Sequence, residues 1–234
     1  MKILSLHKGG RQLATSALFV SVLYVTSACY AQSNQDCSPN NNTYGPFDYR
    51  TANRQQKALV ENAHFTPGVE SLTQGKTGPF GSDIGYTLDV FPNHHRALVT
   101  MERLVEKDRT DPPRHMRMTL DCYYERAMRF AQNDLVLRLL YANHLIKKQR
   151  VVDAMTQIEF VRNSATDNPY TQFNVGMLLF DLKDYERALK QAHLVASMGF
   201  TRTELRDRLV AAGKWTESPI EKAIEQLTPA SGGR

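Results

Sequence analysis

Small side chains recur at one fixed interval in the second half of this 234-residue chain. Ala188 follows Ala154 at the same distance at which Gly176 follows Ala142. This interval of about 34 residues suits a repeated helix–turn–helix unit, and small residues at fixed places in the unit let two helices cross closely. The spacing therefore predicts stacked helical hairpins and an all-α fold.

The turns expected between such units also fall one period apart. They are residues 133–134 (ND) and 167–169 (DNP). In its period and its small residues this stretch resembles the tetratricopeptide (TPR) family over about residues 92–200, with Arg138 and Gln172 where that family has Trp. The resemblance implies a TPR-like helical hairpin array, which is an α-solenoid.

Two short runs carry a further resemblance. HFTP (64–67) and FPNHHRAL (91–98) are similar to segments of exported bacterial proteins that contain tetratricopeptide repeats. This similarity implies the same fold and an exported location, and it implies no substrate.

The flanking regions differ from the repeats in amino-acid composition. Glycine and proline are dense over residues 64–92, which predicts irregular structure there, after a short helix over residues 53–63. Residues 203–212 and the SPIE capping box at 218–221 predict two helices that cap the array. The predicted parts are a signal peptide (1–31), an irregular N-terminal segment with one short helix (32–92), TPR-like repeats (93–200), and C-terminal capping helices with a tail (201–234).

The N-terminus has the layout of a secretory signal peptide. Three basic residues precede an apolar run over residues 13–28, and small residues follow it. The run is short for a membrane span, so cleavage after Ala31 predicts a periplasmic or secreted protein with no membrane span after processing. The alternative is a lipid anchor at Cys29, since TSAC (26–29) resembles a lipobox.

Cleavage also changes the charge. The formal net charge is +5, and losing three basic and no acidic residues leaves +2. This small charge gives little electrostatic support for nucleic-acid binding. Cys37 and Cys122 then remain, and an exported location predicts a disulfide between them; two free thiols are the alternative.

The histidines offer one alternative chemistry. His64, His94 and His95 lie in or near the irregular segment, where imidazoles and carboxylates suit a metal-dependent enzyme. Adjacent His94 and His95 point apart on a helix, which favours capping and hydrogen bonds to loop carbonyls, with Asn93 as the helix cap. The sequence predicts no catalytic residues and no cofactor, because it lacks a nucleophile elbow and the glycine that a phosphate loop requires before Gly75-Lys76-Thr77.

The TPR resemblance implies a partner-binding groove. Asn143 stands where that family often binds a peptide backbone, and aromatic residues suit an adaptable apolar surface. The chain is therefore predicted to be an exported scaffold that binds a protein or peptide; the alternatives are the metal-dependent enzyme and an outer-membrane lipoprotein assembly factor. A C-terminal helix or the N-terminal segment covering Phe173 and Phe180 would close the groove. The implied groove residues are Leu139, Asn143, Ile146, Tyr170, Phe173, Met177 and Phe180.

Overall fold

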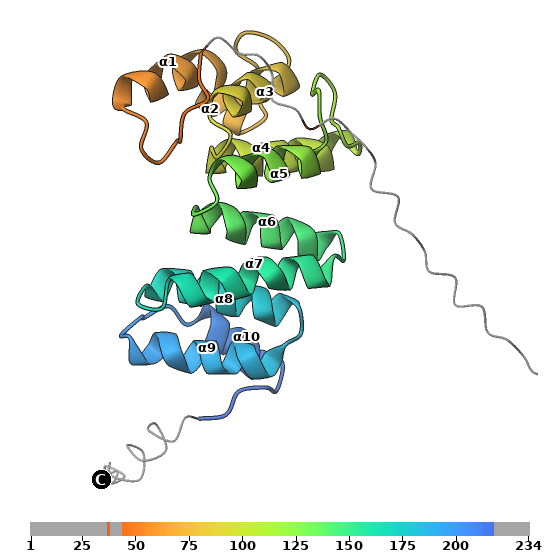
Figure 1. Ribbon diagram of the computed structural model, residues 1–234. Helices are drawn as coiled ribbons and strands as arrows, with labels where there is room; N and C mark the ends of the chain where they lie inside the picture. The colour runs from red at the N-terminus through yellow and green to blue at the C-terminus, as the bar shows by residue number, and fades with distance from the viewer. Residues whose placement is uncertain (1–36, 38–43, 218–234) are drawn as a thin grey trace, which may run out of the picture. The chain divides into compact units, whose positions relative to one another are not determined.

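The computed structural model describes residue 37 and residues 44–217. The chain divides into two units, residues 1–34 and 35–234, and all described residues belong to the second. These residues form ten α-helices and no strand, which confirms the all-α prediction for the part described (Figure 1). None of these helices is both long and apolar enough to cross a membrane.

α1, α2 and α3 lie together at one end, the helices from α4 to α9 follow one another in chain order, and α10 lies beside α8 and α9 (Figure 1). α6 packs along α7, α8 packs along α9, and α10 lies against both α8 and α9. α8 also contacts α6 and α7, and α4 contacts α5 and α6. The bounds are α1 (Arg54–His64), α2 (Pro67–Glu70), α3 (Phe80–Val90), α4 (His95–Asp108), α5 (Leu120–Phe130), α6 (Leu135–Lys147), α7 (Val151–Ser164), α8 (Pro169–Asp181), α9 (Tyr185–Ser197) and α10 (Glu204–Ala211).

The turns within the two central hairpins are the same turn, one period apart. Gln149 ends the α6 side with φ 60°, and Lys183 ends the α8 side with φ 62°. In each turn the next backbone amide donates back to a carbonyl of the helix. Arg150 donates to Leu145 at 2.9 Å, and Asp184 donates to Leu179 at 3.0 Å. Such left-handed closures satisfy the last carbonyls of a helix. The two turns are thus separated by the same interval that separates Ala154 from Ala188 in the sequence.

The small residues lie where helices approach closely. Ala142, Ala154 and Ala188 are fully buried. A Cβ on Gly176 would overlap the Leu205 side chain of α10. The stacking of α10 on α8 therefore depends on the absence of a side chain at position 176.

The junctions between hairpins also repeat. His94, Asp134 and Asn168 are the N-caps of α4, α6 and α8. Each donates its backbone N–H to the carbonyl three residues earlier, at 3.0, 3.0 and 3.3 Å. Each side chain also accepts from the amide three residues later. The interval from the α4 cap to the α6 cap is nevertheless longer than the interval from the α6 cap to the α8 cap.

The prediction of irregular structure over residues 64–92 is wrong for α2 and α3. The glycines in α3 serve close packing, not chain breaking. A Cβ on Gly81 would overlap the backbone of Arg114, and Gly85 lies against Met116 and Tyr123. Buried apolar residues of α3 then stabilise the helix against its neighbours.

The C-terminal end is described only in part. The helix predicted at residues 203–212 is α10, and Gly213 follows it with φ 65°. The second predicted capping helix, which begins at residue 218, lies outside the described residues, as do the predicted signal peptide and Cys29.

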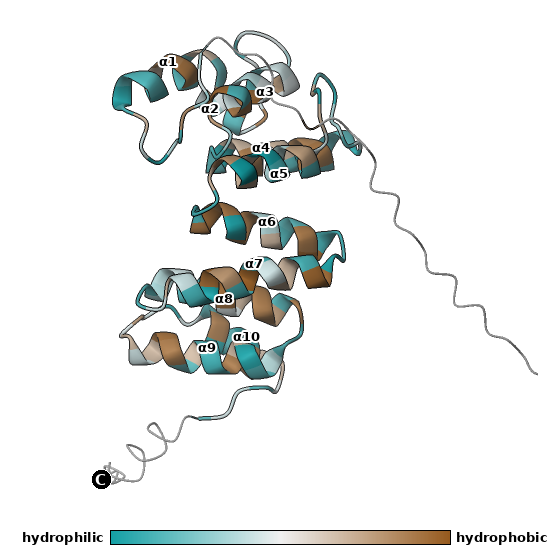
Figure 2. Cartoon of the chain, viewed as in Figure 1, coloured by the Kyte–Doolittle hydropathy of each residue, from teal (hydrophilic) through white to brown (hydrophobic). Residues whose placement is uncertain are grey.

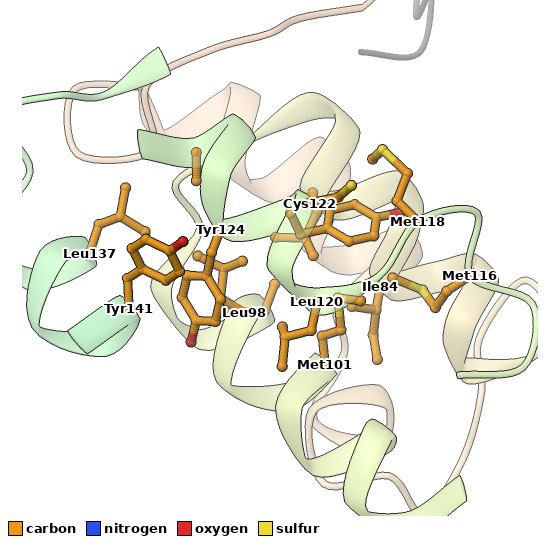
Figure 3. Close-up of a cluster of buried hydrophobic side chains, with 14 of the residues drawn as sticks. Ile84, Leu98, Met101, Met116, Met118, Leu120, Cys122, Tyr124, Leu137 and Tyr141 are labelled. Carbon is orange, nitrogen blue, oxygen red and sulfur yellow. The ribbon is translucent and has the colours of Figure 1, made fainter. Parts of the chain in front are cut away.

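The predicted disulfide between Cys37 and Cys122 is present, with their Cα atoms 5.1 Å apart. Figure 3 shows Cys122 in a buried cluster of side chains contributed by α3, α4, α5, α6 and the loop before α5. Arg129 of α5 also donates to the Cys37 carbonyl at 3.3 Å. The bond therefore fixes the start of the described chain to the core. The labelled residues of the cluster are Ile84, Leu98, Met101, Met116, Met118, Leu120, Cys122, Tyr124, Leu137 and Tyr141.

We expect Cys37→Ser to lower the free energy of unfolding by about 3 kcal/mol, because the bond closes a loop of 85 residues and restricts the unfolded chain. Urea unfolding of the purified protein measures this loss. Wild-type protein in reductant is the matched control and should unfold like the variant. Equal stability of the variant and the oxidised wild type would contradict the prediction.

We expect Gly176→Val to lower the free energy of unfolding by about 2 kcal/mol, since the new side chain must displace Leu205 and strain the contact of α8 with α10. Asn174→Val, at an exposed position of the same helix, is the control and should change stability by less than about 0.5 kcal/mol. Thermal or urea unfolding compares the two. If both variants match the wild type, the close crossing is not a packing constraint.

Candidate functional site

The predicted groove residues belong to a larger set with one geometry. The second, fifth, ninth and twelfth residues after each N-cap share one face of their helix, because steps of three and four residues return to the same side. α6 contacts both α4 and α8, so the three helices that carry these positions are neighbours. We call this set the stripe. It consists of Arg96, Val99, Arg103 and Glu106 on α4; Val136, Leu139, Asn143 and Ile146 on α6; and Tyr170, Phe173, Met177 and Phe180 on α8.

The α8 third of the stripe is partly covered by the chain itself. The Phe173 side chain is only 3% exposed, with the Phe200 ring centroid 5.2 Å away and the Arg202 guanidinium 5.3 Å from its own centroid. Tyr170 also touches Phe200 at 4.8 Å but stays 61% exposed. Phe173 therefore acts as core, while Tyr170 is accessible.

Arg208 of α10 covers the other end of that third. Its guanidinium lies 4.3 Å from the Phe180 centroid and bonds Asp181 at 2.5 Å. It also lies 3.9 Å from the sulfur of Met177. α10 thus covers the Phe180 end of the predicted groove.

The α4 third is charged, and residues 70–72 contact it while Arg96, Arg103 and Glu106 remain exposed. Arg96 forms a two-pronged pair with the Glu70 carboxylate, and Arg103 donates to the Glu70 carbonyl. Lys107 donates to the Leu72 carbonyl at 3.0 Å. The hydrogen bond from Arg96 outweighs burial and lowers the pKa of Glu70. Basic side chains of α4 therefore hold a short stretch of the chain's own backbone.

The α6 third is apolar and partly accessible. Val136 is 50% exposed, and Leu139, Asn143 and Ile146 are half-buried. Within residues 44–217 the Asn143 amide makes no side-chain hydrogen bond. Figure 2 shows hydrophobic residues along much of α6 and α8. Exposed apolar atoms and one unbonded amide therefore lie together on the α6 third.

The three predicted alternative metal ligands do not meet. His64 pairs with Asp83 at 3.2 Å, His94 with Glu61 at 3.1 Å, and His95 with Asp134 at 2.8 Å. In the described part of the chain no three His, Cys, Asp or Glu residues are arranged to hold a metal ion. Each imidazole instead joins two different segments.

Two details of the histidine prediction are wrong. The partners are carboxylates and not loop carbonyls, because buried Asp83 and Asp134 need donors for their charge. The cap of α4 is His94 and not Asn93. Asn93 instead donates to Asp134 at 2.9 Å, one layer further along the chain.

Gly75-Lys76-Thr77 also has an internal partner. The backbone amide of Lys76 donates to the Asp83 carboxylate at 2.8 Å, and the amide of Thr77 donates to it at 3.2 Å. A carboxylate of the protein thus occupies the place that a bound phosphate would take in a phosphate loop.

The sequence identified seven stripe residues and missed the rest. The sequence did not identify the positions on α4, because the interval from the α4 cap to Asp134 is longer than the interval from Asp134 to Asn168. A fixed period therefore places the wrong residues on α4. The run Phe91-Pro-Asn-His94 before α4 was the available signal, since it matches the turn that ends at Asp134.

We expect Phe173→Ala to lower the free energy of unfolding by about 3 kcal/mol, because it empties a buried ring site beneath Phe200. Tyr170→Ala, one turn earlier and exposed, should cost less than about 1 kcal/mol. Urea unfolding followed by fluorescence of Trp215, the only tryptophan, measures both. Equal losses would mean that Phe173 is not a core residue.

The stripe is thus a row of equivalent positions with a charged α4 third, an apolar and partly accessible α6 third, and an aromatic α8 third that residues 200–208 partly cover. Any proposal for its function therefore depends on this arrangement. Comparison with known proteins found no matching protein-family model, no matching curated protein and no matching solved structure.

Proposed function

We propose that this protein is an exported scaffold of the TPR type, which binds a segment of a partner protein across the α6 third of the stripe and Tyr170. The observation that carries this proposal is the combination of partly exposed apolar side chains with the Asn143 amide on the α6 third. Segments of the same chain contact the other two thirds, residues 70–72 on α4 and residues 200–208 on α8. The α4 third is also charged, and Phe173 of the α8 third is buried, so the partly accessible apolar surface lies on α6 beside the exposed Tyr170.

The chemistry of the middle third defines the partner segment. Val136, Leu139 and Ile146 present partly exposed apolar atoms, whose burial gains about 25 cal/mol for each Å². The Asn143 amide can both donate to and accept from a peptide backbone. A segment with apolar side chains and one accessible peptide group beside Asn143 fits these contacts.

Three features support the array and the location. The hairpin turns and the small buried residues repeat at one interval, and tetratricopeptide repeats have the same period of about 34 residues. The disulfide suits an oxidising compartment, so we propose a periplasmic or secreted location. Mass spectrometry of the mature N-terminus distinguishes plain cleavage from a lipid anchor at Cys29.

We expect Asn143→Ala to weaken capture of the partner about tenfold, because a lost hydrogen bond with a buried partner group costs about 1.4 kcal/mol. Partners recovered from a periplasmic extract are identified by mass spectrometry, and the peptide that binds is then titrated by calorimetry. Asn174→Ala, an exposed amide on α8 outside the stripe, is the matched control.

The control variant should bind like the wild type. The proposal is wrong if Asn143→Ala and Val136→Ser both retain full affinity for that peptide, or if Asn174→Ala loses as much.

A further inference from the structure

The cap of α4 differs chemically from the caps of α6 and α8. The Nδ1 atom of His94 accepts a hydrogen bond from the Ala97 amide at 3.1 Å, and the ring is fully buried. Asp134 and Asn168 fill the equivalent positions with oxygen acceptors that do not gain a proton near neutral pH. Only the α4 cap therefore depends on an acceptor that mild acid can remove.

The other ring nitrogen fixes the tautomer. Since Nδ1 accepts, neutral His94 carries its proton on Nε2, which lies 3.1 Å from the Glu61 carboxylate. The same carboxylate oxygen accepts from the Tyr49 hydroxyl at 2.6 Å. A second proton on the ring must therefore enter at Nδ1, where it faces the Ala97 N–H and abolishes the cap.

His94 also holds the segment that precedes α1. We call residues 44–52 the strap. The Tyr49 ring lies on the His94 ring at 4.0 Å, and the Phe47 amide donates to the Val90 carbonyl at 2.8 Å. Beneath the strap, Val90 and Phe91 are fully buried. Departure of the strap would expose this apolar surface.

The groups that face His94 are few. Glu61 comes from α1, Glu70 from α2, Tyr49 from the strap and Arg96 from α4 itself. The rings of Phe65 and Phe91 supply the apolar surroundings. Hydrogen bonds from His94 and Tyr49, against the effect of burial, lower the pKa of Glu61 to about 2. Burial and the bond to Glu61 raise the pKa of Tyr49 to about 12. Neither group changes its charge in mild acid, so His94 is the group in this cluster that does.

We propose that His94 is an acid-operated latch: protonation at Nδ1 breaks the cap of α4 and releases the strap, which the Cys37–Cys122 bond keeps attached to α5. This inference goes beyond partner binding, since it concerns a different surface. Burial disfavours the imidazolium more than Glu61 favours it, so the pKa of His94 lies below 6.5. The docked state then binds fewer protons than the released state, and docking weakens as the pH falls below about 6.5.

Hydrogen–deuterium exchange of the full mature protein tests the latch. After correction for intrinsic rates, we expect strap and Ala97 amides to lose protection about tenfold between about pH 7.5 and about pH 5.5, while α8 and α9 keep theirs. His94→Asn, which copies the cap at Asn168, should remove this dependence. His95→Asn is the neighbouring control and should retain it.

Two results would overturn the latch. One is the same pH dependence in His94→Asn as in the wild type. The other comes from NMR titration of the wild-type His94 ring, which needs no variant: a proton on Nδ1 in the neutral form, or a pKa at or above 6.5, contradicts the proposal.

Discussion

Each stripe helix begins at an N-cap whose side chain accepts a hydrogen bond from the backbone amide three residues later. At Asp134 this bond reaches Leu137 at 3.0 Å, and at Asn168 it reaches Thr171 at 3.0 Å. Successive side chains of an α-helix are rotated by about 100° about the helix axis. If a cap moved by one residue along the sequence, a different set of side chains would therefore face the stripe. The caps therefore determine both the stacking of the hairpins and the residues offered to a partner.

The sequence predicted most strongly those features that depend on local chemistry or on a regular period. The turns at residues 133–134 and 167–169, which end at the caps of α6 and α8, belong to this class. The Cys37–Cys122 bond followed instead from the two cysteines that remain after cleavage. α3 could not be predicted in this way, because Gly81 and Gly85 are breakers in isolation. They are compatible with a helix only because a distant loop packs against them, and nothing within α3 itself reveals that contact.

The candidate site also combines features that the sequence predicts with features that depend on distant contacts. The TPR resemblance implied the positions of Asn143 and Phe173, but it did not imply how exposed each of them is. Phe173 is buried because Phe200 and Arg202 from the following segment lie on it, whereas Asn143 stays half-buried. Equivalent positions in a repeat thus acquire different roles according to what the neighbouring layer places above them.

Asn93 links the strap to the next layer, and its contacts show why the latch and the stripe are separable. It accepts from the Tyr49 amide and donates to Asp48 in the strap, and it also donates to Asp134 at the start of α6. Release of the strap removes the first two bonds and also the pairing of Arg50 with Asp134 at 3.5 Å. Asp134 keeps its own cap bond to Leu137 and its pairing with His95, so α6 retains its starting point. A change at His94 therefore alters the surface near α1 and α3, while the register of the α6 third is held by bonds that do not pass through the strap.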